Sequence, residues 1–259
     1  MTPMQYQVEG AIGRIIFNRP HALNALDSAT AVAFRDAIRT VAADAAIRVV
    51  VLEGAGRAFM AGGDVAELAA DPQGNTPRIM DPLHEAVHQM VELPIPVIAA
   101  LHGAVAGAGM SLALAADLAI AADDTRFQTA YCRIGASPDG SFTWHLVRLV
   151  GLRKAMELTL LSEPVDAIQA LSLGLVNWVV PADELQEHTE VLAQKLAAGA
   201  VGAYGRSKAL LRGAALNSLP EQLAAERQAF LDGAAGAEFH EGATAFLQKR
   251  APHFLKPKD

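Results

Sequence analysis

Two apolar segments in this sequence each run into a glycine-rich turn, and this arrangement limits the chain to folds built on strand-to-helix connections. The first turn, residues 54–64, follows residues 47–53, and the second, residues 102–111, follows residues 97–101. A turn of small residues before a helix exposes backbone N–H groups, and the helix dipole adds partial positive charge. Two such turns aimed at one point would form an anion or oxyanion site, although tight packing of a strand on a helix also favours glycine.

Strand and helix patterns alternate through the first two-thirds of the chain, up to residue 181. Short apolar runs are expected to form strands at residues 11–18, 47–53, 97–101 and 176–180. Apolar residues at helical spacing predict two amphipathic helices, which contain Phe34, Ala37, Ile38 and Val41, and Leu83, Val87, Met90 and Val91. This alternation is typical of an α/β core.

The pattern changes from residue 182 onward, where only helical signals remain. Four helices are expected there, at residues 185–198, 207–214, 220–232 and 237–249. The chain is therefore predicted to consist of an α/β core at residues 1–181 and a helical C-terminal region at residues 182–259. Within the core, residues 68–81 are rich in Pro, Gly and Asn, and we expect them to form a loop that shapes the wall of a pocket.

The composition excludes several classes of function. The formal net charge is -7 without a basic stripe, so nucleic acid and anionic lipid are poor partners. The uncharged residues 97–116 are numerous enough for a membrane span, but their glycines divide them into a strand, a turn and a buried helix. The N-terminus lacks a signal-peptide pattern and the single cysteine, Cys132, fits a reducing compartment, so we expect a cytoplasmic protein.

Five segments carry a resemblance to a known family. They are Asn18-Arg-Pro-His-Ala-Leu-Asn-Ala-Leu26, Phe59-Met-Ala-Gly-Gly-Asp64, Pro96-Val-Ile-Ala-Ala100, Gly107-Ala-Gly109 with Asp117 after it, and Ala245-Phe-Leu-Gln-Lys-Arg250. In order and spacing they resemble the motifs of the crotonase (enoyl-CoA hydratase/isomerase) superfamily, nearly from end to end. The resemblance implies a crotonase-like spiral of ββα units with a helical C-terminal trimerisation region, assembled as a homotrimer or a dimer of trimers.

The resemblance also implies a site for an acyl-CoA thioester, with no further cofactor and no metal. The backbone N–H groups of Gly63 and Ala108 would hold the thioester oxygen and stabilise an enolate. Residues expected at the adenine end of coenzyme A are Ala22, Leu23, Ala61 and Asp64. Lys249 is expected to contact a phosphate of coenzyme A that is bound to a neighbouring subunit.

The two glutamates that hydratases of this family use to activate water are absent. Ser111 and Tyr131 occupy the matching positions, and neither is a general base near pH 7, since tyrosine has a reference pKa of about 10. Asp139 matches an aspartate of two family members that the chain resembles, the ring isomerase of phenylacetate breakdown and 4-chlorobenzoyl-CoA dehalogenase. A turn-forming or capping role after Pro138 is the simpler alternative for Asp139.

His84 and His88 match two histidines of the dehalogenase, although both could be ordinary surface residues on a helix edge. We predict an enoyl-CoA isomerase in which Asp139 moves protons, while His84 and Tyr131 line the acyl pocket. Two alternatives stay open. One is hydrolysis of a thioester or aryl halide through Asp139, with His84 activating water, and the other is a non-catalytic CoA-binding protein.

Residues 84–88 also spell H-E-x-x-H, the signature of a class of zinc proteases. On a helix this spacing places His84 and His88 on one face, with Glu85 as a candidate base. Such a zinc site needs a third ligand, and the segment that follows, Gln-Met-Val-Glu-Leu-Pro, supplies none at the expected spacing. We therefore predict no metal site.

Overall fold

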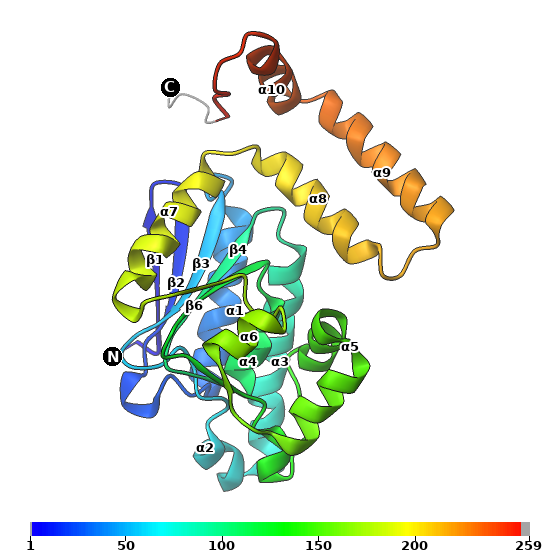
Figure 1. Cartoon of the computed structure of the whole chain (residues 1–259). Coiled ribbons are helices and arrows are strands. Elements are labelled where there is room, and N and C mark those ends of the chain that lie inside the picture. The colour runs from blue at the N-terminus through cyan, green and yellow to red at the C-terminus, as the bar shows by residue number, and fades with distance from the viewer. Residues whose placement is uncertain (1, 255–259) are drawn as a thin grey trace.

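The core of the molecule is a mixed sheet, seen in a computed structural model that describes residues 2–254 (Figure 1). In spatial order its strands are β1 (Met4–Glu9), β2 (Ile12–Phe17), β3 (Val49–Gly54), β4 (Val97–Leu101), β6 (Leu118–Ala122) and β9 (Trp178–Val180). Strand β1 is antiparallel to β2, and the later neighbours are parallel. A smaller sheet contains β5 (Ala104–Ala106), β7 (Arg126–Gln128) and β8 (Val165–Asp166). The predicted α/β class is confirmed.

Helices cover both faces of the large sheet, so alternate residues of a strand face different layers. In β3, Val50 and Leu52 join the main core. This core also contains residues of α1 (Ser28–Ala43), α3 (Pro72–Glu92) and α4 (Ala108–Ala115). Val49 and Val51 face the opposite layer, formed by α7 (Leu185–Ala197). A strand buried on both faces must be apolar at every position, which explains the unbroken aliphatic run in β3.

The remaining helices connect these layers or extend beyond them. They are α2 (Val65–Ala70), α5 (Phe142–Leu161), α6 (Ala167–Ser172), α8 (Val201–Gly213), α9 (Leu219–Ala234), α10 (Ala237–Leu247) and three 3-10 turns, Pro20–Ala22, Tyr131–Ile134 and Ala182–Glu184. Gly151 kinks α5, since its φ of 75° is not helical. No helix within residues 2–254 has both the length and the apolar character that crossing a bilayer requires.

Residues 68–81 are largely helical, so the prediction of a loop there is wrong. Asp71 separates α2 from α3, and its side chain caps α3 by accepting a hydrogen bond from the Gly74 N–H at 3.1 Å. Pro72 occupies the first helical position, where no partner for an N–H is needed. The residues that suggested a loop therefore start a helix. Its buried apolar stripe, including Ile79 and Leu83, packs against α1 despite two prolines within the helix.

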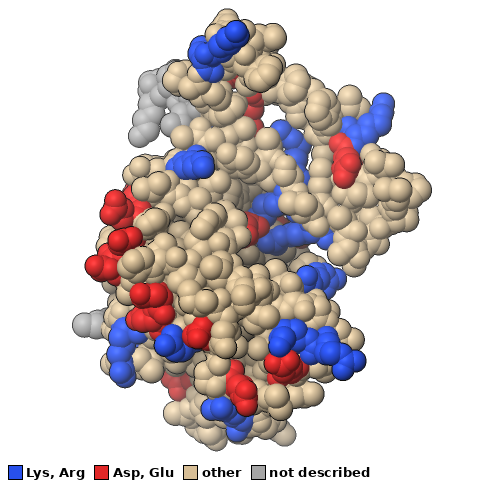
Figure 2. All heavy atoms as spheres, viewed as in Figure 1, with Lys and Arg blue, Asp and Glu red and all other residues tan. Residues whose placement is uncertain are grey.

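Beyond α7, the helices α8, α9 and α10 extend away from the sheet (Figure 1). A charged cluster joins α8 to the core, because Asp117 accepts hydrogen bonds from Lys208 Nζ at 2.6 Å and from Arg212 Nη2 at 2.7 Å. Lys208 also donates to the Ile95 carbonyl and Arg212 to the Val91 carbonyl. Figure 2 shows acidic and basic atoms meeting in the hollow between the core and these helices. The partly buried charges are thus paired, as their burial requires.

Large apolar side chains on α8, α9 and the end of α10 are exposed in the single chain. Leu211 is 76% exposed, Phe230 66% and Phe246 82%. Exposed apolar surface of this kind marks interaction sites. The homotrimer or dimer of trimers stays a prediction, as does the division of the chain after residue 181.

His145 is a buried titratable group at the first turn of α5. It is 8% exposed, and its Nδ1 lies 3.0 Å from the Ser141 hydroxyl. Its Nε2 is buried and has no hydrogen-bond partner among the described residues. The pKa of His145 is lowered to about 4, chiefly by burial, with the charge of Arg212 acting in the same direction and the hydrogen bond to Ser141 opposing it. The folded protein therefore holds this ring neutral over a pH range in which the unfolded chain protonates it.

We expect this histidine to make the fold sensitive to acid. Because its pKa is lower in the folded state, the unfolded chain binds the proton first, so stability falls as the pH drops from about 6.5 toward 4. Between pH 7 and pH 5, the wild type should lose about 1–2 kcal/mol more unfolding free energy than the non-titrating variant His145→Gln. Urea titrations of both proteins at the two pH values measure the difference. Equal losses would contradict the assignment.

Candidate active site

The two glycine-rich turns lie side by side at one edge of the sheet. They follow β3 and β4, which are adjacent and parallel, so both turns leave the sheet in the same direction. The Met60 N–H donates to the Ala104 carbonyl at 3.1 Å, and the Ala106 N–H donates to the Met60 carbonyl at 2.9 Å. The turns singled out in the sequence therefore converge at one point.

Close contact between the turns depends on glycine. A Cβ at position 109 would lie 2.3 Å from the carbonyl oxygen of Met60, closer than any side chain can approach. Gly107 has a φ of +48°, which other residues rarely adopt, and a Cβ there would lie 3.2 Å from the Cα of Gly62. These glycines let the two backbones meet without a side chain between them.

Two backbone N–H groups are free where the turns meet. Within residues 2–254, the amides of Gly63 and Ala108 donate to no backbone carbonyl, whereas the adjacent Gly107 amide donates to Gln128 at 3.1 Å. Ala108 is the first residue of α4, so its N–H also lies at the positive end of the helix dipole. A carbonyl oxygen placed between the two amides could accept two hydrogen bonds, which is the requirement of an oxyanion hole.

The residues expected at the adenine end of coenzyme A lie together beside the first turn. The Ala61 N–H donates to the Leu23 carbonyl at 3.0 Å, and Ala22 directly precedes Leu23 in a 3-10 turn. Arg19, close to that turn in sequence, donates to the Asp64 carboxylate at 3.0 Å. Burial raises the pKa of Asp64, but hydrogen bonds from Arg19 and from the backbone of α2 outweigh it and lower the pKa overall.

Asn24 shapes this turn, although no role was assigned to it from the sequence. It is 1% exposed, and its side chain accepts a hydrogen bond from Arg19 N–H and donates to the carbonyls of Ala55 and Ala58. Leu23 and Asn24 both have positive φ values, 51° and 56°. Asparagine tolerates this conformation and satisfies backbone groups in turns, so the second asparagine of the first motif was the available signal.

Ser111, Tyr131 and Asp139 form a hydrogen-bonded cluster at the first turn of α4. The Tyr131 hydroxyl donates to Asp139 Oδ1 at 2.6 Å and lies 2.8 Å from Ser111 Oγ. The Ser111 hydroxyl has one proton to donate, and two carbonyl acceptors lie within reach of its Oγ, that of Asp139 at 3.0 Å and that of Gly107 at 3.3 Å. The carboxylate is thereby attached to the helix whose first amide is that of Ala108.

The two hydroxyls of this cluster are not bases. Burial raises the pKa of Tyr131 far above its usual value, and the negative charge of Asp139 raises it further. Tyr131 therefore remains protonated and acts as a hydrogen-bond donor. Within the described chain, Asp139 is the sole carboxylate of the hydrogen-bonded cluster, and it is the group there that can accept a proton from a substrate.

The His84 side chain contacts the segment next to Asp139, whereas the Glu85 and His88 side chains of the H-E-x-x-H segment do not. His84 Nε2 accepts a hydrogen bond from the Gly140 N–H at 3.2 Å. Glu85 pairs with Arg39 at 3.0 Å, and His88 is exposed one turn later. Among residues 2–254, no three His, Cys, Asp or Glu side chains are grouped to hold a metal ion.

Lys249 lies far along the chain from these residues and is exposed just after α10, in the part that extends from the sheet (Figure 1). The contact expected from a neighbouring subunit stays a prediction.

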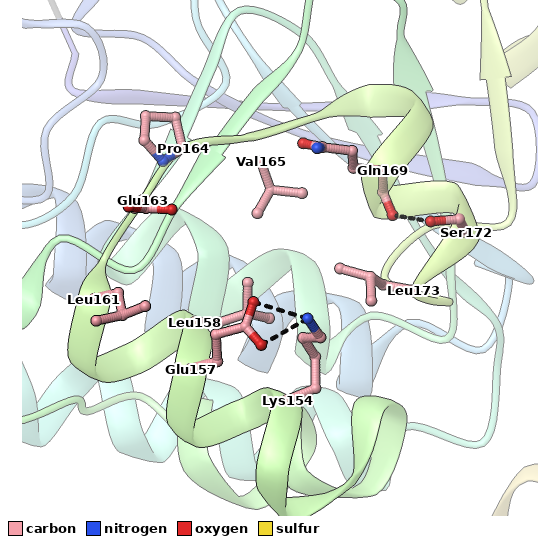
Figure 3. A pocket seen from close by; sticks show the side chains of 10 residues that line it. All are labelled: Lys154, Glu157, Leu158, Leu161, Glu163, Pro164, Val165, Gln169, Ser172 and Leu173. Atoms are coloured by element: carbon pink, nitrogen blue, oxygen red, sulfur yellow. Dashed lines mark hydrogen bonds and ion pairs between the residues drawn. The ribbon is translucent and has the colours of Figure 1, made fainter.

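The pocket shown in Figure 3 is a separate surface feature with a volume of about 280 Å³. It lies between α5 and α6 and is lined by Lys154, Glu157, Leu158, Leu161, Glu163, Pro164, Val165, Gln169, Ser172 and Leu173. An ion pair of 2.7 Å joins Lys154 and Glu157 at its rim. None of the turn or cluster residues lines it, so this pocket is not the candidate site.

Comparisons with known proteins agree on one family. The model of the Enoyl-CoA hydratase/isomerase family matches residues 7–257. A probable enoyl-CoA hydratase of Rhodobacter capsulatus is 38% identical over 253 residues, which cover 97% of each chain. The 1,2-epoxyphenylacetyl-CoA isomerase of Escherichia coli is 36% identical, with 95% of this chain and 96% of the relative covered. The crystal structure of an enoyl-CoA hydratase from Polaromonas matches with a TM-score of 0.92 at 35% identity, covering 96% and 98%.

The contact between the turns predicts the effect of Gly109→Ala. The added Cβ would force the Met60 carbonyl away and separate the amides of Gly63 and Ala108. Loss of one oxyanion donor typically lowers kcat by about 10²–10³, and we expect a loss of this size in turnover of an acyl-CoA substrate, together with a lower Tm. Gly213→Ala is the control, since its Cβ would meet only Asn217 Nδ2 at 3.5 Å. Equal activity of the two variants would contradict the role of the contact.

Proposed function

The chain belongs to the enoyl-CoA hydratase/isomerase family, and on this basis we propose that it is an acyl-CoA isomerase with Asp139 as its acid and base. The observation that carries the proposal is the cluster of Ser111, Tyr131 and Asp139. It contains one carboxylate and two neutral hydroxyls, and Ser111 connects it to the first turn of α4, where the Ala108 amide is free.

The free amides account for activation of the substrate. With the thioester oxygen between Gly63 N–H and Ala108 N–H, two hydrogen bonds stabilise the negative charge that develops on this oxygen. A proton on a carbon conjugated with the thioester then becomes acidic enough to be removed. The resulting dienolate or enolate keeps its charge on the oxygen that the two amides hold.

Asp139 accounts for transfer of the proton. Its Oδ1 is occupied by the Tyr131 hydroxyl, which orients the carboxylate. The carboxylate takes a proton from one carbon of the acyl group and becomes a carboxylic acid, whose proton exchanges with solvent before the acid delivers a proton to another carbon. The double bond moves and no atom is added, so one acid/base group is sufficient for the whole reaction.

Hydration makes a different demand, because a water molecule must be oriented, deprotonated and added while a proton is delivered to carbon. By the family resemblance, two glutamates divide that work, and Ser111 and Tyr131 stand in their places. Tyr131 is held in its protonated form beside Asp139, and Ser111 is a weak acid committed to hydrogen bonds. Relatives are named as hydratases and as isomerases, and this pair of hydroxyls favours the isomerase.

Exchange of solvent deuterium tests the proposal. The protein is mixed with 2-enoyl-, 3-enoyl- and aryl-CoA thioesters in deuterated water, and the products are measured by mass. We expect deuterium at carbon without addition of water, and Asp139→Asn should lower turnover by about 10²–10⁴ because the base is removed. Asp183→Asn, an exposed carboxylate on the 3-10 turn before α7, is the control.

Other products would overturn the proposal in distinct ways. Net hydration would mean that the hydroxyls suffice to activate water. Label from ¹⁸O water in a free acid or phenol would indicate hydrolysis through Asp139. Full turnover by Asp139→Asn would remove this residue from the mechanism, and binding of CoA without any turnover would leave a non-catalytic protein.

A further inference from the structure

We propose that His84 is a positioning residue, which holds Asp139 in place through the Gly140 amide and transfers no proton itself. This inference rests on the proposed role of Asp139. It assigns to His84 a task different from both expectations drawn from the sequence, which were contact with the acyl group and activation of water.

The segment that carries Asp139 needs to be held from outside. Residues 136–139 form neither helix nor strand, and residues 132–137 are exposed. Two contacts act on Asp139 itself, the Tyr131 hydroxyl at its carboxylate and the Ser111 hydroxyl at its carbonyl. Both come from the same hydrogen-bonded pair of hydroxyls, so they fix one side of the segment.

The bond from Gly140 to His84 fixes the opposite side. Gly140 is buried with a φ of +59°, and a Cβ there would lie 3.2 Å from Ser111 Cβ and 3.4 Å from Leu83 Cδ2. The backbone therefore passes through a narrow gap between α3 and α4, where the positive φ and the close neighbours both favour glycine. Its N–H is buried in that gap and requires an acceptor, which His84 Nε2 supplies at 3.2 Å.

Accepting this hydrogen bond decides what His84 can do. A neutral imidazole has one acceptor nitrogen, and here the lone pair of Nε2 is occupied by the Gly140 N–H. The ring proton must then be on Nδ1, which is a donor. In this state His84 has no free lone pair with which to deprotonate water, so the geometry disfavours a general-base role.

The helix that carries His84 is a firm support. On either side of it along α3, Leu83, Ala86, Val87 and Met90 are buried in the main core against α1. His84 itself is exposed, so its ring can be changed without opening the core. Removing the ring should free Gly140 and let the adjacent carboxylate shift, while the turns that bind the thioester oxygen stay as they are.

Two amide variants separate positioning from proton transfer. In His84→Gln the side-chain oxygen can reach the place of Nε2 and accept the Gly140 N–H, but it is no base, whereas in His84→Asn the side chain is one carbon shorter and falls short. We expect kcat for deuterium-incorporating isomerisation to fall by about 100-fold in His84→Asn and His84→Ala, the scale of a misplacement near 1 Å. His84→Gln should recover most of kcat, and KM should be unchanged in all three.

His88→Ala is the matched control, an exposed histidine one turn along the same helix, and it should retain wild-type kcat. Tm values of all variants establish that they are folded. His84→Gln as slow as His84→Ala would overturn the inference in favour of proton transfer. Wild-type kcat in His84→Ala would overturn the inference and mean that His84 has no role in the reaction. A change confined to KM would overturn it in favour of contact between His84 and the substrate. Asp139→Asn in the same assay reports on the proposed function separately, since its full activity would sink that proposal whatever the His84 variants do.

Discussion

The approach of two backbones at the glycine-rich turns is the constraint on which the rest of the site depends. Met60 pairs with residues of the second turn, and the absence of a side chain at Gly109 allows its carbonyl to come close. This contact places the amides of Gly63 and Ala108 beside each other at the end of two parallel strands. This placement of the two amides depends on the buried strand β3, on the helix α4 and on the glycines of both turns. A single added Cβ at Gly109 would disrupt it.

Much of this arrangement follows from sequence patterns, because strands buried on both faces and amphipathic helices leave clear periodic signals. Residues 97–101 are the clearest case, and the strand begins and ends as expected. Short strands such as β5 and β7 left no such signal, since three residues show no period and their pairing depends on partners far along the chain. The segment at 68–81 misled for a different reason, because Asp-Pro marks a turn in one context and a capped helix start in another.

The candidate site, like the fold, could be predicted from the sequence only in part. Asp139, Tyr131 and Ser111 were each singled out by position, but their hydrogen bonds to one another could not be deduced from residues separated by as many as 28 positions. From the sequence alone, Ser111 and Tyr131 therefore mark only the absence of two glutamates. In the structure Tyr131 donates to the remaining carboxylate, that of Asp139, and Ser111 lies at the backbone carbonyl of the same residue. The role of Gly140 has no sequence signal, because it depends on the gap between α3 and α4 and on an N–H that needs a partner.

The carboxylate and the free amides come from separate parts of the chain, and this separation has an evolutionary consequence. The turns that would hold a thioester oxygen are part of the packed core and change only at great cost to folding. The segment around Asp139 is irregular, largely exposed and attached by a few side chains. Proteins with this fold can therefore conserve the backbone amides that bind one class of substrate while a few side chains on the segment around Asp139 change. Such changes can give new reactions without a new fold.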